Sequence, residues 1–260
     1  MSSQQNEIAG RLCLITGASG GIGAACALAL AAEGCDLALT YSSNKEAVDK
    51  LAVAINTATE ESNDERFKNQ KITVHHADMG NPEQILSMCD EVQKSHGRGV
   101  DILIPNAGYG KRITDPSDIP LEEFDAMINI NLRAPFLCVK GVVDHMKAQK
   151  WGRIIFMSSI AAIGGGANGC HYAASKGGLS GMMKNLSTRL AQYNISVNDV
   201  APAMIGATGM LRSADEIPGL LDSIPLNRLG EPQEVANAVV MLAKTGWMTG
   251  QSLLMTGGLK

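Results

Sequence analysis

The stretch Thr16-Gly17-Ala18-Ser19-Gly20-Gly21-Ile22-Gly23 follows an apolar run at 11–16 and opens an alanine-rich run at 21–33. The first run is typical of a buried strand and the second of a helix. Glycines at such a junction let the chain turn tightly and let backbone N–H groups approach a pyrophosphate, while the helix N-terminus adds partial positive charge. The stretch therefore predicts a dinucleotide-binding turn after the first strand.

Short apolar runs alternate with helical patterns along the rest of the chain, and most lack alternating polarity, as parallel strands covered on both faces do. Right-handed crossovers then make the sheet doubly wound. We expect one Rossmann-type α/β domain over residues 1–260, with a doubly wound parallel sheet of about seven strands and helices on both faces. The expected strands are 11–16, 36–41, 71–77, 101–105, 153–157, 195–200 and 252–255; the expected helices are 21–33, 45–60, 82–96, 121–150 with a break near Pro135, 172–192 and 232–244.

Two segments lie outside this alternation. Residues 60–69 are charged and polar, which indicates a solvated surface insertion. Residues 203–230 carry apolar side chains between prolines and glycines, so they are too apolar for a disordered linker. We expect this second segment, called the flap below, to cover the substrate.

Composition excludes several classes of protein. The net charge of −4 argues against a broad nucleic-acid interface. No run approaches the ~18 uncharged apolar residues of a membrane-spanning helix, and the polar start of the chain, residues 1–6, does not resemble a signal peptide. The six cysteines form no C-x-x-C pair and the five histidines lack ligand spacing, so neither a disulfide framework nor a metal site is expected. These features predict a cytoplasmic protein with reduced thiols.

A candidate catalytic pair follows the fifth expected strand. Tyr172 and Lys176 are four residues apart on an expected helix and so share one face. An ammonium group beside a phenol should lower the phenol pKa, which suits a proton donor to a carbonyl oxygen. Ser159, at the carboxyl end of the strand, could orient that carbonyl. A second pair with the same spacing, Tyr41 and Lys45, has no serine 13 residues upstream and is interpreted as fortuitous.

Together these motifs resemble the short-chain dehydrogenase/reductase family over residues 8–258, with closest similarity to 3-oxoacyl-carrier-protein reductases and related carbonyl reductases. The resemblance rests on an ordered set of motifs: 16–23, Asp78-Met79, Asn106-Ala107-Gly108, Asn131, Ser159, 172–176 and 198–202.

The resemblance implies a role for each matching residue. Tyr172 would donate the proton, Lys176 would lower its pKa and bind the nicotinamide ribose, and Ser159 would position the carbonyl. Asn131 would hold a water that links Lys176 to solvent. The expected cofactor contacts are Gly17, Ser19, Gly21, Ile22, Gly23, Tyr41, Ser42, Ser43, Asp78, Met79, Asn106, Ala107, Gly108, Tyr172, Lys176, Pro202 and Ile205.

Three positions depart from the family pattern. Pro105 stands where a second asparagine is usual, Ala203 replaces a glycine after Pro202, and Thr256 begins a near-terminal motif that usually begins with aspartate. Ala203 puts the backbone approach to the nicotinamide carboxamide in question. None of these departures involves the four catalytic positions.

The end of the second strand predicts the cofactor. An acidic residue there binds a ribose 2′-hydroxyl and repels a 2′-phosphate. Here the chain reads Tyr41-Ser42-Ser43-Asn44-Lys45, and Asp36 lies at the opposite end of the strand. We therefore expect NADP(H), although Gly20 stands where many NADP-binding members carry a basic residue.

Substrate and assembly are less constrained by the sequence. Ser159, Ile160, His171, Tyr172 and Ala203 are the expected substrate contacts, with His171 more typical of a pocket wall than of an acid–base group. The expected function is NADPH-dependent reduction of a ketone, a β-keto ester, a 3-oxoacyl thioester or a similar carbonyl to a secondary alcohol. The alternative is a catalytically idle NADPH-binding sensor or scaffold. The resemblance also implies a homotetramer or, as an alternative, a dimer.

Overall fold

The computed structural model describes residues 5–62, 64–164, 167–211, 213 and 219–259. Its centre is a seven-stranded parallel sheet in the order β3-β2-β1-β4-β5-β6-β7. The strands are β1 Leu12–Ile15, β2 Asp36–Tyr41, β3 Ile72–His76, β4 Ile102–Ile104, β5 Gly152–Met157, β6 Ile195–Pro202 and β7 Ser252–Met255. The predicted doubly wound parallel sheet is confirmed.

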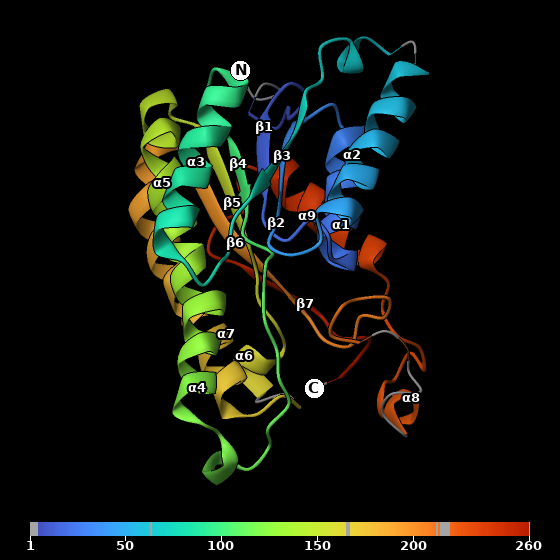
Figure 1. Ribbon diagram of the computed structural model, residues 1–260, viewed down its shortest axis with the longest axis vertical. Coiled ribbons are helices and arrows are strands. Elements are labelled where there is room, and N and C mark those ends of the chain that lie inside the picture. The colour runs from blue at the N-terminus through green and yellow to red at the C-terminus, as the bar shows by residue number, and fades with distance from the viewer. Residues whose placement is uncertain (1–4, 63, 165–166, 212, 214–218, 260) are drawn as a thin grey trace.

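Helices cover both faces of the sheet (Figure 1). One core joins the sheet to α1 (Gly21–Ala32), α2 (Lys45–Glu60) and α9 (Pro232–Lys244). A second core on the other face joins it to α3 (Pro82–His96), α5 (Ala134–Gln149) and α7 (Cys170–Leu190). Side chains of β1 alternate between these cores, because neighbouring residues of a strand point to opposite faces. Both cores are mainly aliphatic, as the scarcity of aromatic residues predicts.

The chain order reverses between β1 and β4, which are neighbours in the sheet although β2 and β3 intervene in sequence. At such a switch point the loops leaving the two carboxyl ends diverge and leave a crevice. The glycine turn follows β1, and Asn106 follows β4. The fold therefore places both motifs at the edge where doubly wound sheets bind ligands.

The helical segment 121–149 contains a break that differs from the expected one. It divides into α4 (Leu121–Ile128), a π-turn (Asn129–Arg133) and α5, and Pro135 lies in the first turn of α5. A proline is tolerated there because first-turn N–H groups have no partner within the helix. The irregularity is therefore the π-turn itself, and Asn131 lies at its centre.

The same segment corrects a second expectation. Residues 121–149, whose most apolar 18-residue window has a mean hydropathy of 1.3, form a helix long and apolar enough to cross a membrane by length and composition. Of its most apolar window, 44% is buried here, and α5 packs against the sheet and α3. Packing of α5 in the core accounts for part of this apolar composition.

The flap carries a short helix, α8 (Leu220–Ser223), and a small apolar core of its own. A parallel bridge between Ile205 and Gly230 joins its two ends. Residues 212 and 214–218 of the predicted flap lie outside the described residues. The predicted insertion 60–69 contains a short 3₁₀ turn, Glu65–Phe67, and is largely exposed.

Candidate functional site

The glycine turn is tied directly to the end of β4. Asn106 Nδ2 donates to the carbonyls of Thr16 and Gly17 at 3.0 and 3.1 Å, and the Thr16 hydroxyl accepts from the N–H of Ala107 at 3.0 Å. A Cβ on Gly23 would collide with the Gly17 carbonyl and would lie 2.7 Å from Asn106 Nδ2. The turn therefore needs glycine at position 23 to close on β4.

The start of α1 fits an anionic ligand. Its N-cap is Gly20, no side chain caps the helix, and the first turn contains no acidic residue. The first-turn N–H groups and the positive end of the helix dipole are thus available to a phosphate. The backbone at the expected contacts Gly17 and Ser19 leads into this helix end, so the turn fits the predicted pyrophosphate.

The expected adenosine-side residues lie at the ends of β2 and β3. Ser42 and Ser43 are exposed, and the Tyr41 ring packs against His76 with centroids 5.3 Å apart. Asp78 is exposed and its carboxylate accepts from the N–H of Gly80 at 2.8 Å, whereas Met79 is buried. Lys45 is paired with Asp49 at 2.6 Å, one helical turn away.

The structure brings the predicted catalytic residues Ser159 and Tyr172 together. Tyr172 is 7% exposed, and its hydroxyl is hydrogen-bonded to Ser159. Burial raises the pKa of Tyr172 above its usual range, and the bond to Ser159 lowers it in part. The expected fall of the Tyr172 pKa is therefore wrong for this structure, because desolvation outweighs the hydrogen bond to Ser159.

Lys176 lies next to the Tyr172 phenol ring. Its ammonium is 5.7 Å from the centroid of the Tyr172 ring and donates to the carbonyl of Met157, at the end of β5, at 2.8 Å. Burial lowers the pKa of Lys176 to about 8, and the buried carboxylate of Asp199 opposes this shift. Asp199 itself accepts from Ser180 at 3.2 Å. Asp199 belongs to the motif at 198–202, but its position in the sequence alone does not predict an electrostatic effect on Lys176.

Asn131 is fully buried, and its side-chain amide is hydrogen-bonded to other groups of the protein. Oδ1 accepts from the N–H of Tyr109, and Nδ2 donates to the carbonyl of Tyr109, each at 2.8 Å. Nδ2 also contacts Ser175 Oγ at 3.1 Å. The side chain thus clamps the segment after β4, and the expected water relay through Asn131 stays a prediction.

The expected substrate contacts surround Tyr172 unequally. Ile160 and Ala203 are half-buried and joined to the sheet edge, since Ile160 donates to the Pro202 carbonyl and Ala203 to that of Met255. His171 is fully buried, and neither ring nitrogen has a protein partner within the described ranges. Contact of these residues with a substrate stays a prediction.

The flap lies over the crevice. A Cβ on Gly21, in the first turn of α1, would collide with the carbonyl of Ala207. Met210 reaches the segment after β4, where its sulfur is 3.2 Å from the position of a Cβ on Gly110. The expected contacts Pro202 and Ile205 are buried where this segment begins. The flap therefore covers both the glycine turn and the catalytic side of the crevice.

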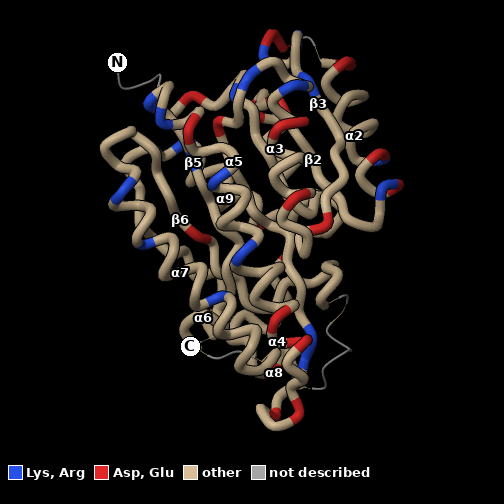
Figure 2. Tube along the Cα trace, turned by 60° about the vertical axis from the view of Figure 1, so that its left-hand side comes forward, with Lys and Arg blue, Asp and Glu red and all other residues tan. Residues whose placement is uncertain are grey.

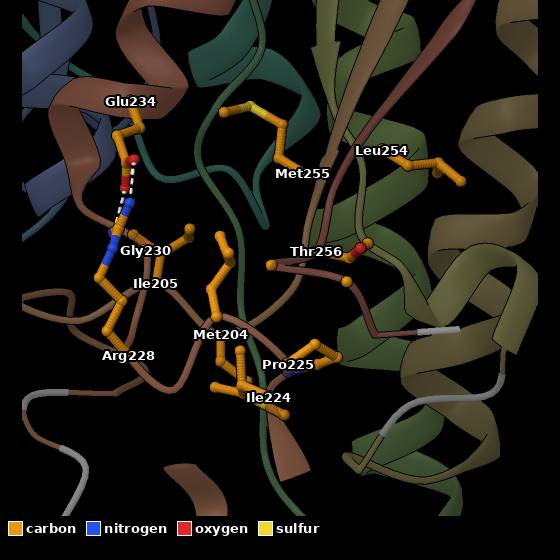
Figure 3. A pocket seen from close by; sticks show the side chains of 13 residues that line it. Met204, Ile205, Ile224, Pro225, Arg228, Gly230, Glu234, Leu254, Met255 and Thr256 are labelled. Atoms are coloured by element: carbon orange, nitrogen blue, oxygen red, sulfur yellow. Dashed lines mark hydrogen bonds and ion pairs between the residues drawn. The ribbon is translucent and has the colours of Figure 1, made fainter. Parts of the chain in front are cut away.

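A cavity of about 500 Å³ lies between the flap and the end of β7 (Figure 3). An ion pair of Arg228 with Glu234, at 2.7 Å, stands at its wall. Ile205 is the only expected site residue among its lining residues, which are otherwise mainly apolar. The cavity therefore does not coincide with the Ser159–Tyr172 centre.

Sequence reasoning missed a polar group beside Tyr172. The ring of Tyr109 packs against the cluster of Tyr172, Met127 and Ala161, and its hydroxyl is hydrogen-bonded to Glu123 of α4. Glu123 is also paired with Lys111 at 2.9 Å. In the sequence, the signal for this group is the carboxylate of Glu123 on the apolar side of α4. Solvated helix faces carry carboxylates in the same pattern, so this signal does not identify the group.

Comparisons with known proteins agree with this geometry. The family model described as short chain dehydrogenase matches residues 11–218. A 3-oxoacyl-[acyl-carrier-protein] reductase of Synechocystis sp. is 35% identical, covering 96% of each chain. The NADPH-dependent aldehyde reductase 2, chloroplastic, of Arabidopsis thaliana is 33% identical, covering 99% of this chain and 97% of that protein.

A solved structure is similar throughout. The blue fluorescent protein from a metagenomic library, in complex with NADPH, superposes with a TM-score of 0.85 at 32% identity, covering 97% of this chain and 98% of that chain. The ordered motifs, the strand order and these matches agree over nearly the whole length. The chain is an oxidoreductase that belongs to the short-chain dehydrogenase/reductase family.

Proposed function

We propose that this oxidoreductase uses NADPH to reduce a ketone to a secondary alcohol, with a β-keto ester, a 3-oxoacyl thioester or a similar carbonyl as substrate. The observation that carries the proposal is the buried Tyr172 hydroxyl, hydrogen-bonded to Ser159 beside the ammonium of Lys176. These groups lie at the same sheet edge as the glycine turn. A proton donor, an orienting hydroxyl and a dinucleotide turn form the minimal set for carbonyl reduction.

The protein groups divide the work of the reaction. When bound, the reduced nicotinamide supplies the hydride that the carbonyl carbon takes up. Ser159 donates a hydrogen bond that orients the carbonyl oxygen, and Tyr172 gives its proton to that oxygen as negative charge develops. The raised pKa of Tyr172 keeps the phenol protonated until this moment. The positive charge of Lys176 then stabilises the phenolate that remains.

NADPH is favoured over NADH by the end of β2. Within the described chain, residues 41–45 offer two exposed hydroxyls and the ammonium of Lys45, and no carboxylate. Asp36, at the amino end of β2, is held by Arg98 at 2.8 Å. A 2′-phosphate would compete with Asp49 for Lys45. The printed name of the Arabidopsis relative and the NADPH complex of the similar structure support the same choice.

The proposal is tested by consumption of NADPH at 340 nm with a panel of ketones, β-keto esters and 3-oxoacyl thioesters. Turnover of at least one class, with a higher kcat/KM for NADPH than for NADH, is expected. Ser42→Asp should shift this preference towards NADH, because a carboxylate repels the 2′-phosphate; Ser62→Asp, on the exposed insertion, is the matched control. NADPH binding without turnover of any substrate would instead indicate the idle sensor or scaffold.

We also propose a homotetramer, supported by apolar side chains left exposed on α4 and α5. Leu121 and Phe136 are 79% and 50% exposed, and Phe124 lies between them in sequence. Charged residues of both signs are scattered over the chain (Figure 2). Light scattering should give four times the chain mass, and Phe136→Lys should lower it if this face is buried between copies. An unchanged mass would assign the contact elsewhere.

A further inference from the structure

His171 immediately precedes Tyr172 in the first turn of α7 and has no exposed surface. Within the part of the chain that the structure describes, both ring nitrogens lack a hydrogen-bond partner. A neutral imidazole has one N–H donor and one acceptor nitrogen, and leaving a buried polar group unpaired costs about 1–3 kcal/mol. Such a residue in a native protein requires a partner of some kind.

Glu123, on α4, has a complementary unpaired atom. Its Oε2 is 2.9 Å from Lys111 Nζ, and the Tyr109 hydroxyl also bonds to the carboxylate, whereas Oε1 is buried without a protein partner. The pKa of Glu123 is lowered, chiefly by the bond to Lys111. α4, which carries Glu123, packs directly against α7, which carries His171.

The two unpaired sites match a single small ligand. A carboxylate oxygen only accepts, and the imidazole N–H only donates, so a water molecule can accept from His171 and donate to Glu123. No ion pair joins the two side chains in the described ranges, so their separation exceeds direct contact. Buried waters typically satisfy polar groups of this kind.

The same group is continuous with the catalytic residues. Tyr109 is held at its backbone by Asn131, at its hydroxyl by Glu123, and at its ring by packing against the cluster of Tyr172. His171 is covalently next to Tyr172. Glu123 therefore reaches the Tyr172 cluster through Tyr109, and His171 reaches it along the chain.

We propose that Glu123 and His171 hold one buried water between them and, through it, act as positioning residues for Tyr172. The water closes a chain from Asn131 through Tyr109 and Glu123 to the first turn of α7. This chain fixes the direction of the Tyr172 phenol relative to Ser159. The assignment of a positioning effect rests on the reductase function proposed above.

A double-mutant cycle tests the bridge in the full-length protein. His171→Phe and Glu123→Met keep the volume and remove the polar atoms. Each should lower kcat about 10- to 100-fold, since small displacements of a catalytic group have effects of this size. The double variant should lose no more than the worse single variant, because each change opens the same chain. NADPH affinity, measured by fluorescence titration, should stay within about twofold.

Two conservative variants separate positioning from simple loss of structure. Glu123→Gln keeps atoms that can bind the water and should retain kcat within about threefold. Lys111→Gln removes an exposed cation but can still donate a hydrogen bond to the same carboxylate, so it should have an equally small effect. Multiplicative losses in the double variant, or parental kcat in Glu123→Met, would overturn the proposal. If His171→Phe does not fold, the two Glu123 variants still decide.

A crystal structure at a resolution that shows ordered water tests the site without any assay. Density for one water between Glu123 Oε1 and the His171 ring is expected, and it should vanish in Glu123→Met. Direct contact of the two side chains, or a dry gap, would overturn the proposal. If the crystal structure shows this water but the protein reduces no ketone, the water site stands and the proposed reductase function is disproved.

Discussion

The side-chain amide of Asn131 pairs with both backbone groups of Tyr109, accepting from its N–H and donating to its carbonyl at 2.8 Å each. This two-point pairing gives the segment after β4 the bonds that a neighbouring strand would otherwise supply. It also fixes the ring that packs against Tyr172. One side chain in the π-turn thereby sets the position of a neighbour of the catalytic phenol.

Replacing Asn131 by alanine should destabilise the protein by about 2 kcal/mol or more, because both Tyr109 groups lose a buried partner. Urea unfolding followed by circular dichroism measures the change. Asn56→Ala, on the exposed face of α2, is the control and should change stability by less than about 0.5 kcal/mol. Equal effects of the two substitutions would contradict a structural clamp at Asn131.

Tyr172→Phe should lower kcat for ketone reduction about 10²- to 10⁴-fold, the range for loss of a general acid. NADPH affinity should be unchanged, since the ring is retained. The matched control is Tyr193→Phe, which removes a phenol hydroxyl from the 3₁₀ turn after α7 and should keep full activity. Substantial reduction by Tyr172→Phe would move the proton donor elsewhere.

The pH dependence of the two reaction directions should differ. Burial raises the pKa of Tyr172, so the proton donor stays protonated through neutral pH and reduction should not fall until alkaline pH. Oxidation of the alcohol requires the phenolate and should increase as pH rises towards that pKa. The hydrogen bond to Ser159 lowers the pKa of Tyr172. Removing this bond should therefore move both limbs of the pH profiles to higher pH. The shift is measured by pH profiles of kcat/KM in each direction for the parent protein and for Ser159→Ala. Identical pH profiles for the two proteins would contradict the effect of Ser159 on the Tyr172 pKa.

Lys176 should make stability pH-dependent in an unusual window. Its folded pKa of about 8 lies below the ordinary 10.5, so between these values the unfolded chain binds more protons than the folded protein. Stability must then rise with pH from about 8 to about 10.5 through this group, by an amount on the order of 3 kcal/mol. Lys176→Met should be more stable at pH 7 and lack the rise. Urea midpoints at pH 7, 8 and 9.5 measure it, and parallel curves for the two proteins would exclude the effect.

Gly23→Ala should weaken NADPH binding at least about tenfold, because its Cβ has no room against the Gly17 carbonyl and the Asn106 amide. The control is Gly181→Ala in α7, where a Cβ meets nothing within 4 Å. That control should bind NADPH normally and gain about 0.5–1 kcal/mol of stability from its higher helix propensity. Fluorescence titration separates the two, and equal affinities would exclude a tight glycine turn.

The sequence predicts the sheet well because most strands are short, largely apolar runs that are separated by helical patterns. Asp36–Tyr41, Lys45–Glu60, Pro82–His96 and Pro232–Lys244 have the expected bounds. The π-turn at Asn131 was not predicted, since its residues continue a helical pattern and only the long-range pairing with Tyr109 stabilises the irregularity.

The sequence predicts which residues form the candidate site, but it does not predict the pKa shifts within the site. Spacing places Lys176 beside Tyr172, but the balance between a neighbouring charge and desolvation depends on burial, which the pattern does not give. The contacts of Glu123 with Tyr109 and Lys111 join segments that only tertiary packing brings together. The exposure of Cys170, against five buried thiols, is likewise set by its place at the start of α7.

The carbonyl of Ala207 lying against Gly21 has a kinetic consequence. We expect a dinucleotide that binds at the start of α1 to displace this carbonyl, so that encounter and capture become separate steps. The observed rate of association should level off at high NADPH concentration instead of rising linearly, and the plateau reports how often the segment lifts. Departure of the nucleotide should pass the same contact, so we expect this contact to influence the turnover rate of the proposed reaction.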